Sequence, residues 1–155
     1  MSIESRRTPY DDEYETCLET RAKLLIYPGE LHPDEITRRL GLVPTEANVA
    51  GKVRVNRLGR EHVVKISGWF LSSEGHVESK ELRRHLDWLL ALLRPARAAL
   101  LELQSMRGVT MGIDCVWTSR SGHGGPTLWP EQMHEMAALG LECSFDVYFF
   151  GDDQQ

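Results

Sequence analysis

Cysteine is scarce in this chain, and its placement excludes two classes of protein. The three cysteines, Cys17, Cys115 and Cys143, are an odd number and are far apart in the sequence. Disulfide-rich secreted domains use even sets of cysteines, and structural zinc sites use closely spaced pairs. We therefore expect reduced thiols that pack as small buried side chains, and a cytoplasmic location.

Long apolar runs and an excess of basic charge are also missing. No stretch approaches the roughly 20 apolar residues that cross a bilayer. Residues 1–15, MSIESRRTPYDDEYE, have no apolar core after their arginines, so we expect no secretory signal. The formal net charge is -5, from 18 Lys and Arg against 23 Asp and Glu. We thus expect no nucleic-acid partner and no membrane partner.

The glycine-rich loop SGHGGPT (121–127) fails the test for a dinucleotide site. It reads G-x-G-G, Thr127 stands where the motif has its last glycine, and Pro126 removes an amide donor. The chain also contains no H-E-x-x-H, no G-K-[ST] and no G-x-S-x-G. We interpret the loop as a strand-to-helix turn, with a ligand contact by His123 at its tip as the alternative. We assign no catalytic residue, no cofactor and no metal, and we favour a protein that is not an enzyme.

The composition that is present is typical of one folded domain. Of 155 residues, 41% are hydrophobic and 26% are charged, which suits a single core of ordinary size. No linker, repeat or low-complexity segment divides the chain. We predict one domain over 1–155 with an ordered core over about 16–150, a flexible segment over 1–15 and a flexible tail, GDDQQ.

Hydrophobic periodicity predicts alternating strands and helices. Strand patterns occupy 17–27, 109–120 and 142–150, helical patterns occupy 28–42, 79–106 and 129–140, and 52–75 is typical of a hairpin with NRLG at its tip. Pro95 must kink or split the long helix. The order β-α-β(β)-α-β-α-β predicts an α+β fold: a largely antiparallel sheet of about four to five strands with helices packed on one face.

Alternation then assigns side chains to the two faces of the sheet. The face under the helices is expected to hold Met111, Ile113, Cys115, Trp117, Cys143, Phe145, Val147 and Phe149. The open face is expected to hold Asp114, Asp146 and Tyr148. By the same parity Lys65 and Trp69 join the open face, an assignment that a single bulge reverses.

Two interpretations of Asp114 and Asp146 are open. They form a metal or acid–base pair, or each joins Lys23, Lys65 or Arg21 in a solvated cross-strand network. We favour the network because such pairs are common between strands.

The open face also has the mixed charged and aromatic composition of a protein interface. We predict a non-catalytic module, immunity-like or regulatory, that binds a protein partner through this face. The alternative is a small-molecule or metal-binding protein that uses Asp114, Asp146 and the glycine loop. The candidate binding residues are Lys65, Trp69, Asp114, His123, Asp146 and Tyr148. The oligomeric state is not determined by the sequence.

Five stretches taken together resemble one family: HPDEITRRLGLVPTEA, GWFLSSEG, LRRHLDWLLALL, HGGPTL and LGLECSFDVYFF. They are similar to the bacterial family domain of unknown function 4279, from about Cys17 to Phe150. The resemblance implies a small single-domain bacterial protein of alternating strands and helices, an architectural glycine loop, and no catalytic residues to transfer. His32 and Trp129 depart from it, because small helix-capping residues are expected there.

Overall fold

The computed structural model describes residues 6–151. Its strands and helices are β1 (Cys17–Tyr27), α1 (Pro33–Leu40), β2 (Glu46–Asn48), β3 (Val53–Val55), β4 (Glu61–Val63), β5 (Gly68–Ser72), α2 (Leu82–Leu93), α3 (Arg97–Gln104), β6 (Thr110–Ser119), α4 (Pro130–Ala138) and β7 (Cys143–Tyr148).

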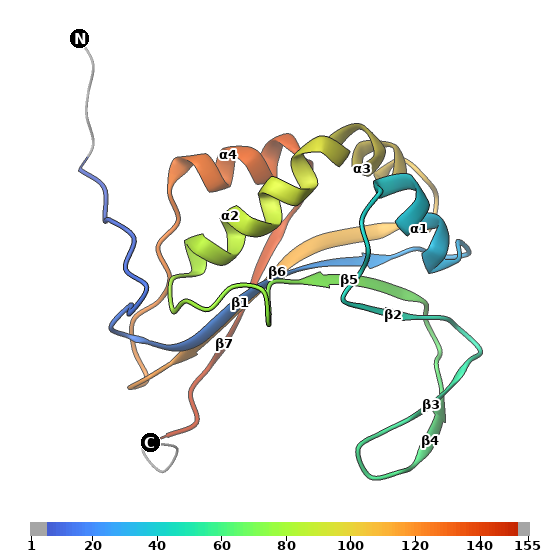
Figure 1. Ribbon diagram of the computed structural model, residues 1–155, viewed down its shortest axis with the longest axis horizontal. Helices are drawn as coiled ribbons and strands as arrows, with labels where there is room; N and C mark the ends of the chain where they lie inside the picture. Colours follow the sequence, from blue (N-terminus) through green and yellow to red (C-terminus); the bar gives the residue numbers. More distant parts are fainter. Residues whose placement is uncertain (1–5, 152–155) are drawn as a thin grey trace.

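These elements form two layers (Figure 1). One sheet has the strand order β2-β5-β1-β6-β7, and the helices lie over one of its faces. β1 pairs antiparallel with β5 and β6, β2 pairs antiparallel with β5, and β7 runs parallel to β6. The predicted α+β fold with a largely antiparallel sheet is confirmed.

The core lies between the central strand and the longest helix. Ala22, Leu24 and Ile26 of β1 are fully buried on the helix side, as the alternation predicts. Helix α2 supplies a buried row of leucines, among them Leu86 and Leu90. A short 3-10 turn over 94–96 separates α2 from α3, so the predicted break at Pro95 is confirmed.

The segment between residues 43 and 75 differs from the prediction of one hairpin. β3 and β4 form a separate two-stranded sheet that projects away from the helices, and β5 belongs to the main sheet (Figure 1). The NRLG tip is confirmed: Asn56 Oδ1 accepts from the amides of Leu58 and Arg60, and Gly59 takes a positive φ of 74°. Residues 64–67 belong to neither sheet, so alternation counted along β4 does not continue into β5.

Residues 8–16, which belong to the segment that the sequence predicts to be flexible, make specific contacts with the rest of the chain. The fully buried Arg83 donates to the carbonyls of Thr8 (2.6 Å) and Pro9 (3.1 Å), and its ion-pair partner Glu81 accepts from the amide of Asp11 (3.0 Å). The Arg83 guanidinium also lies 4.6 Å from the centre of the Tyr10 ring. Residues 1–5 and 152–155 lie outside the described residues.

The two departures from the family pattern have local explanations. His32 caps α1, because its Nδ1 accepts from the amide of Asp34 at 3.0 Å. Trp129 precedes α4, and its indole Nε1 donates to the carbonyl of Thr8 at 2.9 Å. Over residues 6–151, no helix has both the length and the apolar character that a bilayer crossing requires.

Candidate functional site

The open face of the sheet is built by the alternate residues of its strands. In β1, Arg21, Lys23 and Leu25 point away from the helices. The register places Lys23 opposite Asp114 and Leu25 opposite Gly112 on β6, and Asp114 opposite Ser144 on β7. Charged and polar groups therefore gather where β1, β6 and β7 run side by side.

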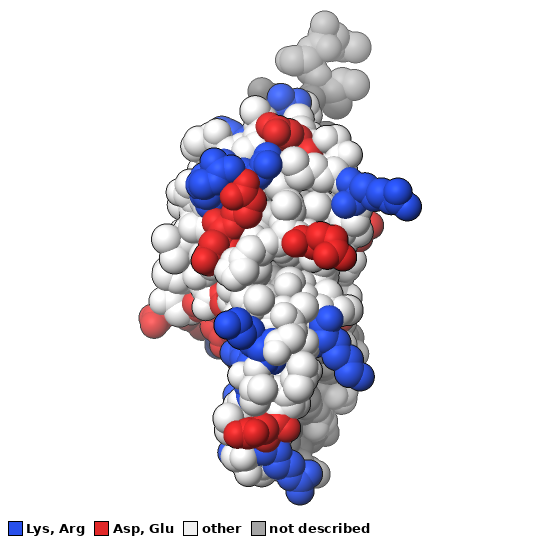
Figure 2. Space-filling model, turned by 90° about the vertical axis from the view of Figure 1, so that its right-hand side faces the viewer, with Lys and Arg blue, Asp and Glu red and all other residues white. Residues whose placement is uncertain are grey.

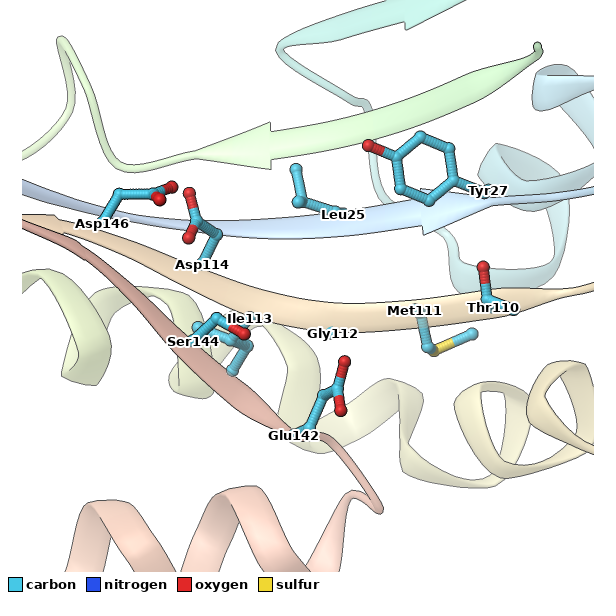
Figure 3. A pocket seen from close by; sticks show the side chains of 10 residues that line it. All are labelled: Leu25, Tyr27, Thr110, Met111, Gly112, Ile113, Asp114, Glu142, Ser144 and Asp146. Carbon is cyan, nitrogen blue, oxygen red and sulfur yellow. The ribbon is translucent and has the colours of Figure 1, made fainter.

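A groove of about 290 Å³ lies on this face. Leu25 and Tyr27 form part of its wall, and Asp114, Asp146 and Glu142 supply carboxyl groups around it (Figure 3). Gly112 of β6 lies in the groove between them, and a Cβ there would meet Glu142 Cγ at 3.0 Å. A glycine inside a strand often marks a place where another group approaches the backbone closely.

Asp114 and Asp146 meet at one end of the groove, as Figure 3 shows. Burial, and then the hydrogen bond to Asp146 and its charge, raise the pKa of Asp114 above its ordinary value of 3.8. Two adjacent carboxyl groups bind one proton together because like charges disfavour double ionisation. The aspartates thus form a carboxyl pair, which is part of the alternative that we did not favour from the sequence.

The favoured interpretation, in which the aspartates form ion pairs with basic residues of the sheet, is wrong because those bases make other contacts. Arg21 pairs with Glu74 at 3.8 Å, and the Lys23 ammonium lies over the Phe70 ring, 5.6 Å from its centre. Both bases still lower the pKa of Asp114 through space, but less than the other effects raise it. Within residues 6–151, no three His, Cys, Asp or Glu side chains are grouped to hold a metal ion.

Trp69 is not on the open face, so that placement is wrong. It is fully buried under α1, where its indole Nε1 donates to Thr37 Oγ1 at 3.0 Å. Lys65 is exposed but lies between β4 and β5, outside the main sheet. Both errors have one cause: residues 64–67 break the alternation on which the assignment depends.

Tyr148 is on the open face as predicted, 45% exposed, with its ring stacked on Phe150. The expectation for the other side of β7 is wrong, because Phe145, Val147 and Phe149 are not covered by helices. These three side chains are 43% to 61% exposed. β7 is the outer strand after α4 and runs beyond the helical layer (Figure 1). The sequence carries no local signal of this exposure, because the residues themselves are typical of a buried strand.

The glycine loop and His123 form a separate region. His123 Nδ1 bonds to Ser121 Oγ at 2.9 Å, and its carbonyl accepts from Ser119 Oγ at 2.8 Å. Asp114 and Ser119 are five positions apart on β6, which is roughly 16 Å of strand. The structure therefore does not bring His123 to the carboxyl pair.

The loop is held from the N-terminal side. Tyr14 donates its hydroxyl to the carbonyl of Gly125 at 2.8 Å. Gly124 has a φ of 89°, and a Cβ there would lie 2.5 Å from Thr16. A side chain is thus excluded by both conformation and space, which supports the interpretation of an architectural turn.

Comparison with known proteins gives one match. The sequence profile of the family described as Domain of unknown function (DUF4279) matches residues 18–150, which is nearly the whole chain. No curated protein and no solved structure matches. The chain belongs to the DUF4279 family, as the resemblance of its motifs predicts.

Proposed function

We propose that this member of the DUF4279 family is a non-catalytic protein-binding module of the bacterial cytoplasm, and that it binds an extended segment of a partner protein. The segment adds as a strand to the free edge of β7. Its apolar side chains lie beside Phe145 and Val147, and its basic side chains lie beside the carboxyl pair. The single observation that carries the proposal is the exposed apolar outer strand.

An outer strand offers unpaired backbone N–H and C=O groups to another chain. Monomeric proteins usually protect such an edge with several charged residues, a proline or a covering loop. β7 (CSFDVY) has one charged residue, Asp146, and no proline. Exposed apolar residues that are contiguous along an edge are a mark of an interaction site. Addition of a partner strand uses the backbone for affinity and the alternate side chains for specificity.

The carboxyl pair gives the edge a preference for basic segments. Asp146 lies on β7 itself, and Asp114 lies on the neighbouring strand. The groove beside them has room for a long side chain such as lysine or arginine. A cation placed there favours the ionised form of both carboxyl groups, so binding lowers the pKa of Asp114.

The cysteines support a reducing compartment. Cys17, Cys115 and Cys143 are all free thiols. The Sγ atoms of Cys115 and Cys143 are 3.8 Å apart on neighbouring strands. Thiols in such contact stay unbonded most readily where the surroundings keep them reduced.

A small organic cation is the second candidate ligand. The observation in its favour is the groove itself, with about 290 Å³ of space and three carboxyl groups around it. It differs from the leading proposal in needing no free strand edge.

The proposal is tested with two short synthetic peptides of alternating residues, one of lysine and valine and one of glutamate and valine. Binding of each labelled peptide is measured by fluorescence anisotropy at low and high salt. We expect the lysine peptide to bind, more weakly at high salt, and the glutamate peptide not to bind. Val147→Asp should abolish binding, whereas Val43→Asp should not, because Val43 is 80% exposed and lies outside both the edge and the groove.

Each outcome decides between the candidates. Equal binding of the two peptides contradicts the preference for basic segments, and full binding by Val147→Asp contradicts strand addition at β7. A thermal shift with small polyamines that Val147→Asp retains, without peptide binding, replaces the proposal with the small-cation candidate.

A further inference from the structure

The hairpin of β3 and β4 is a second exposed apolar element, here named the arm and defined as residues 52–66. Val53, Val55 and Val63 share one of its faces by register, and they are 58% to 63% exposed. Leu58 at the tip and Ile66 at the base are exposed further. A two-stranded hairpin on its own is marginally stable in water, so such an element gains most from packing on another surface.

The charge of the arm is opposite to that of the rest of the chain. The arm contains five of the 18 Lys and Arg residues and one of the 23 Asp and Glu residues, so its formal charge is +4 and the remainder carries -9. Figure 2 shows blue Lys and Arg side chains flanking the lower part of the molecule, where the arm projects. An arm of this charge is attracted to the acidic body of the same protein.

The residue pattern of β3 matches the requirements of the β7 edge. The segment KVRV (52–55) alternates basic and apolar residues, so Lys52 and Arg54 lie on one face and the valines on the other. β7 alternates in the complementary way, with Asp146 on its open side and Phe145 and Val147 on its helix side. A strand with the pattern of β3 that pairs with β7 therefore places its basic side chains on the side of Asp146 and its valines on the side of Phe145 and Val147.

Within one molecule the arm and β7 lie at opposite edges of the main sheet (Figure 1). The arm projects between β2 and β5 at one edge of the sheet, and β7 is the opposite edge. Four strand spacings of about 4.8 Å separate the two edges, which is roughly 19 Å. Figure 1 also shows the arm directed away from β7.

We propose that the arm of one copy adds to the β7 edge of a second copy of this chain. The inference rests on the proposed use of the β7 edge, for which it names a ligand. Arm-to-edge contact joins two different surfaces, so two copies that exchange arms form a closed dimer, whereas exchange that does not close gives longer chains. Direct pairing of two β7 edges is disfavoured because it brings two carboxyl pairs onto one face.

The experiment is sedimentation velocity on the full chain, over a wide concentration range, at low and high salt. We expect wild-type protein to assemble in multiples of 17.7 kDa, more weakly at high salt. Val55→Asp in the arm and Val147→Asp in the edge should each weaken assembly about tenfold or more. Val43→Asp is the matched control with full assembly, and circular dichroism confirms that every variant is folded.

Mixing the two defective variants gives the decisive result. The Val147→Asp copy keeps an intact arm and the Val55→Asp copy keeps an intact edge, so the mixture should form a complex that neither variant forms alone. No complex on mixing, or assembly that only Val147→Asp disrupts, overturns the inference in favour of another contact. A wild-type monomer at every concentration also overturns it, and lysine-peptide binding then tells whether the proposed function survives.

Discussion

The buried ion pair of Glu81 and Arg83 offers the sharpest test of how the N-terminal segment is held. Both side chains are fully buried. Arg83 Nε donates to Glu81 Oε2 at 2.9 Å, and the rest of the guanidinium is bonded to the chain at Thr8 and Pro9. Glu81→Gln leaves a buried guanidinium without its counter-charge.

The expected cost of Glu81→Gln is about 3–5 kcal/mol of unfolding free energy, the usual loss when one partner of a buried pair is removed. A domain of this size has roughly 5–15 kcal/mol in total, so the change is a large share of it. The double variant Glu81→Gln/Arg83→Met removes both charges and keeps an apolar stem. It should lose less than the single variant, about 1–3 kcal/mol, because only the carbonyls of Thr8 and Pro9 then lack a donor.

The assay is urea denaturation at neutral pH for the wild type, both single variants and the double variant. Limited trypsin digestion of the same proteins reports whether the N-terminal segment is released, since Arg83→Met removes its anchor. If either single change costs under about 1 kcal/mol, or if the double variant loses as much as the sum of the singles, the pair is not a coupled buried pair and the reasoning is refuted.

Three further predictions concern the face and the core. Asp114→Asn should raise the unfolding free energy at neutral pH by about 0.5 kcal/mol. The pKa of Asp114 is raised in the folded protein, so folding becomes less favourable as the pH rises above the ordinary pKa of the carboxyl group. Urea titrations at pH 4 and 7 check this. Trp69→Ala should cost about 3–5 kcal/mol of unfolding free energy, because it empties a buried site, and a loss under about 1 kcal/mol in urea denaturation would contradict the buried placement. Burial lowers the pKa of His85, so the unfolding free energy should fall as the pH drops below 6.5, by at most about 1.4 kcal/mol per pH unit. This dependence of the unfolding free energy on pH should vanish in His85→Gln.

Much of the fold could be predicted because its signals are local. The alternation of Ala22, Leu24 and Ile26 indicates a strand with one buried face. The ring of Pro95 breaks the long helix whatever the tertiary contacts of that helix are. The facing positions of Asp114 and Asp146 follow from parity in two uninterrupted strands. The first two of these inferences need no knowledge of which strands are neighbours, whereas the approach of Asp114 to Asp146 also requires β6 and β7 to be adjacent.

Other features fail local prediction because they depend on a break or a distant contact. Residues 64–67 interrupt the alternation, so Trp69 was assigned to the wrong face and Lys65 to a sheet that it does not join. The anchoring of Thr8 by Arg83 joins residues that are 75 positions apart, and no periodicity connects them. Burial of an arginine is also contrary to its general preference for the surface.

The sequence alone determined most of the helices and strands, the α+β class, the family and the sheet face that carries Asp114 and Asp146, because residue pattern and backbone chemistry act over a few neighbouring residues. Only the tertiary structure decided that β7 is an outer strand whose apolar side chains are exposed, and that the basic arm projects from the opposite edge. Phe145 and Val147 have the character of core residues. Whether such residues are buried depends on which element covers them, and that is a property of the assembled layers.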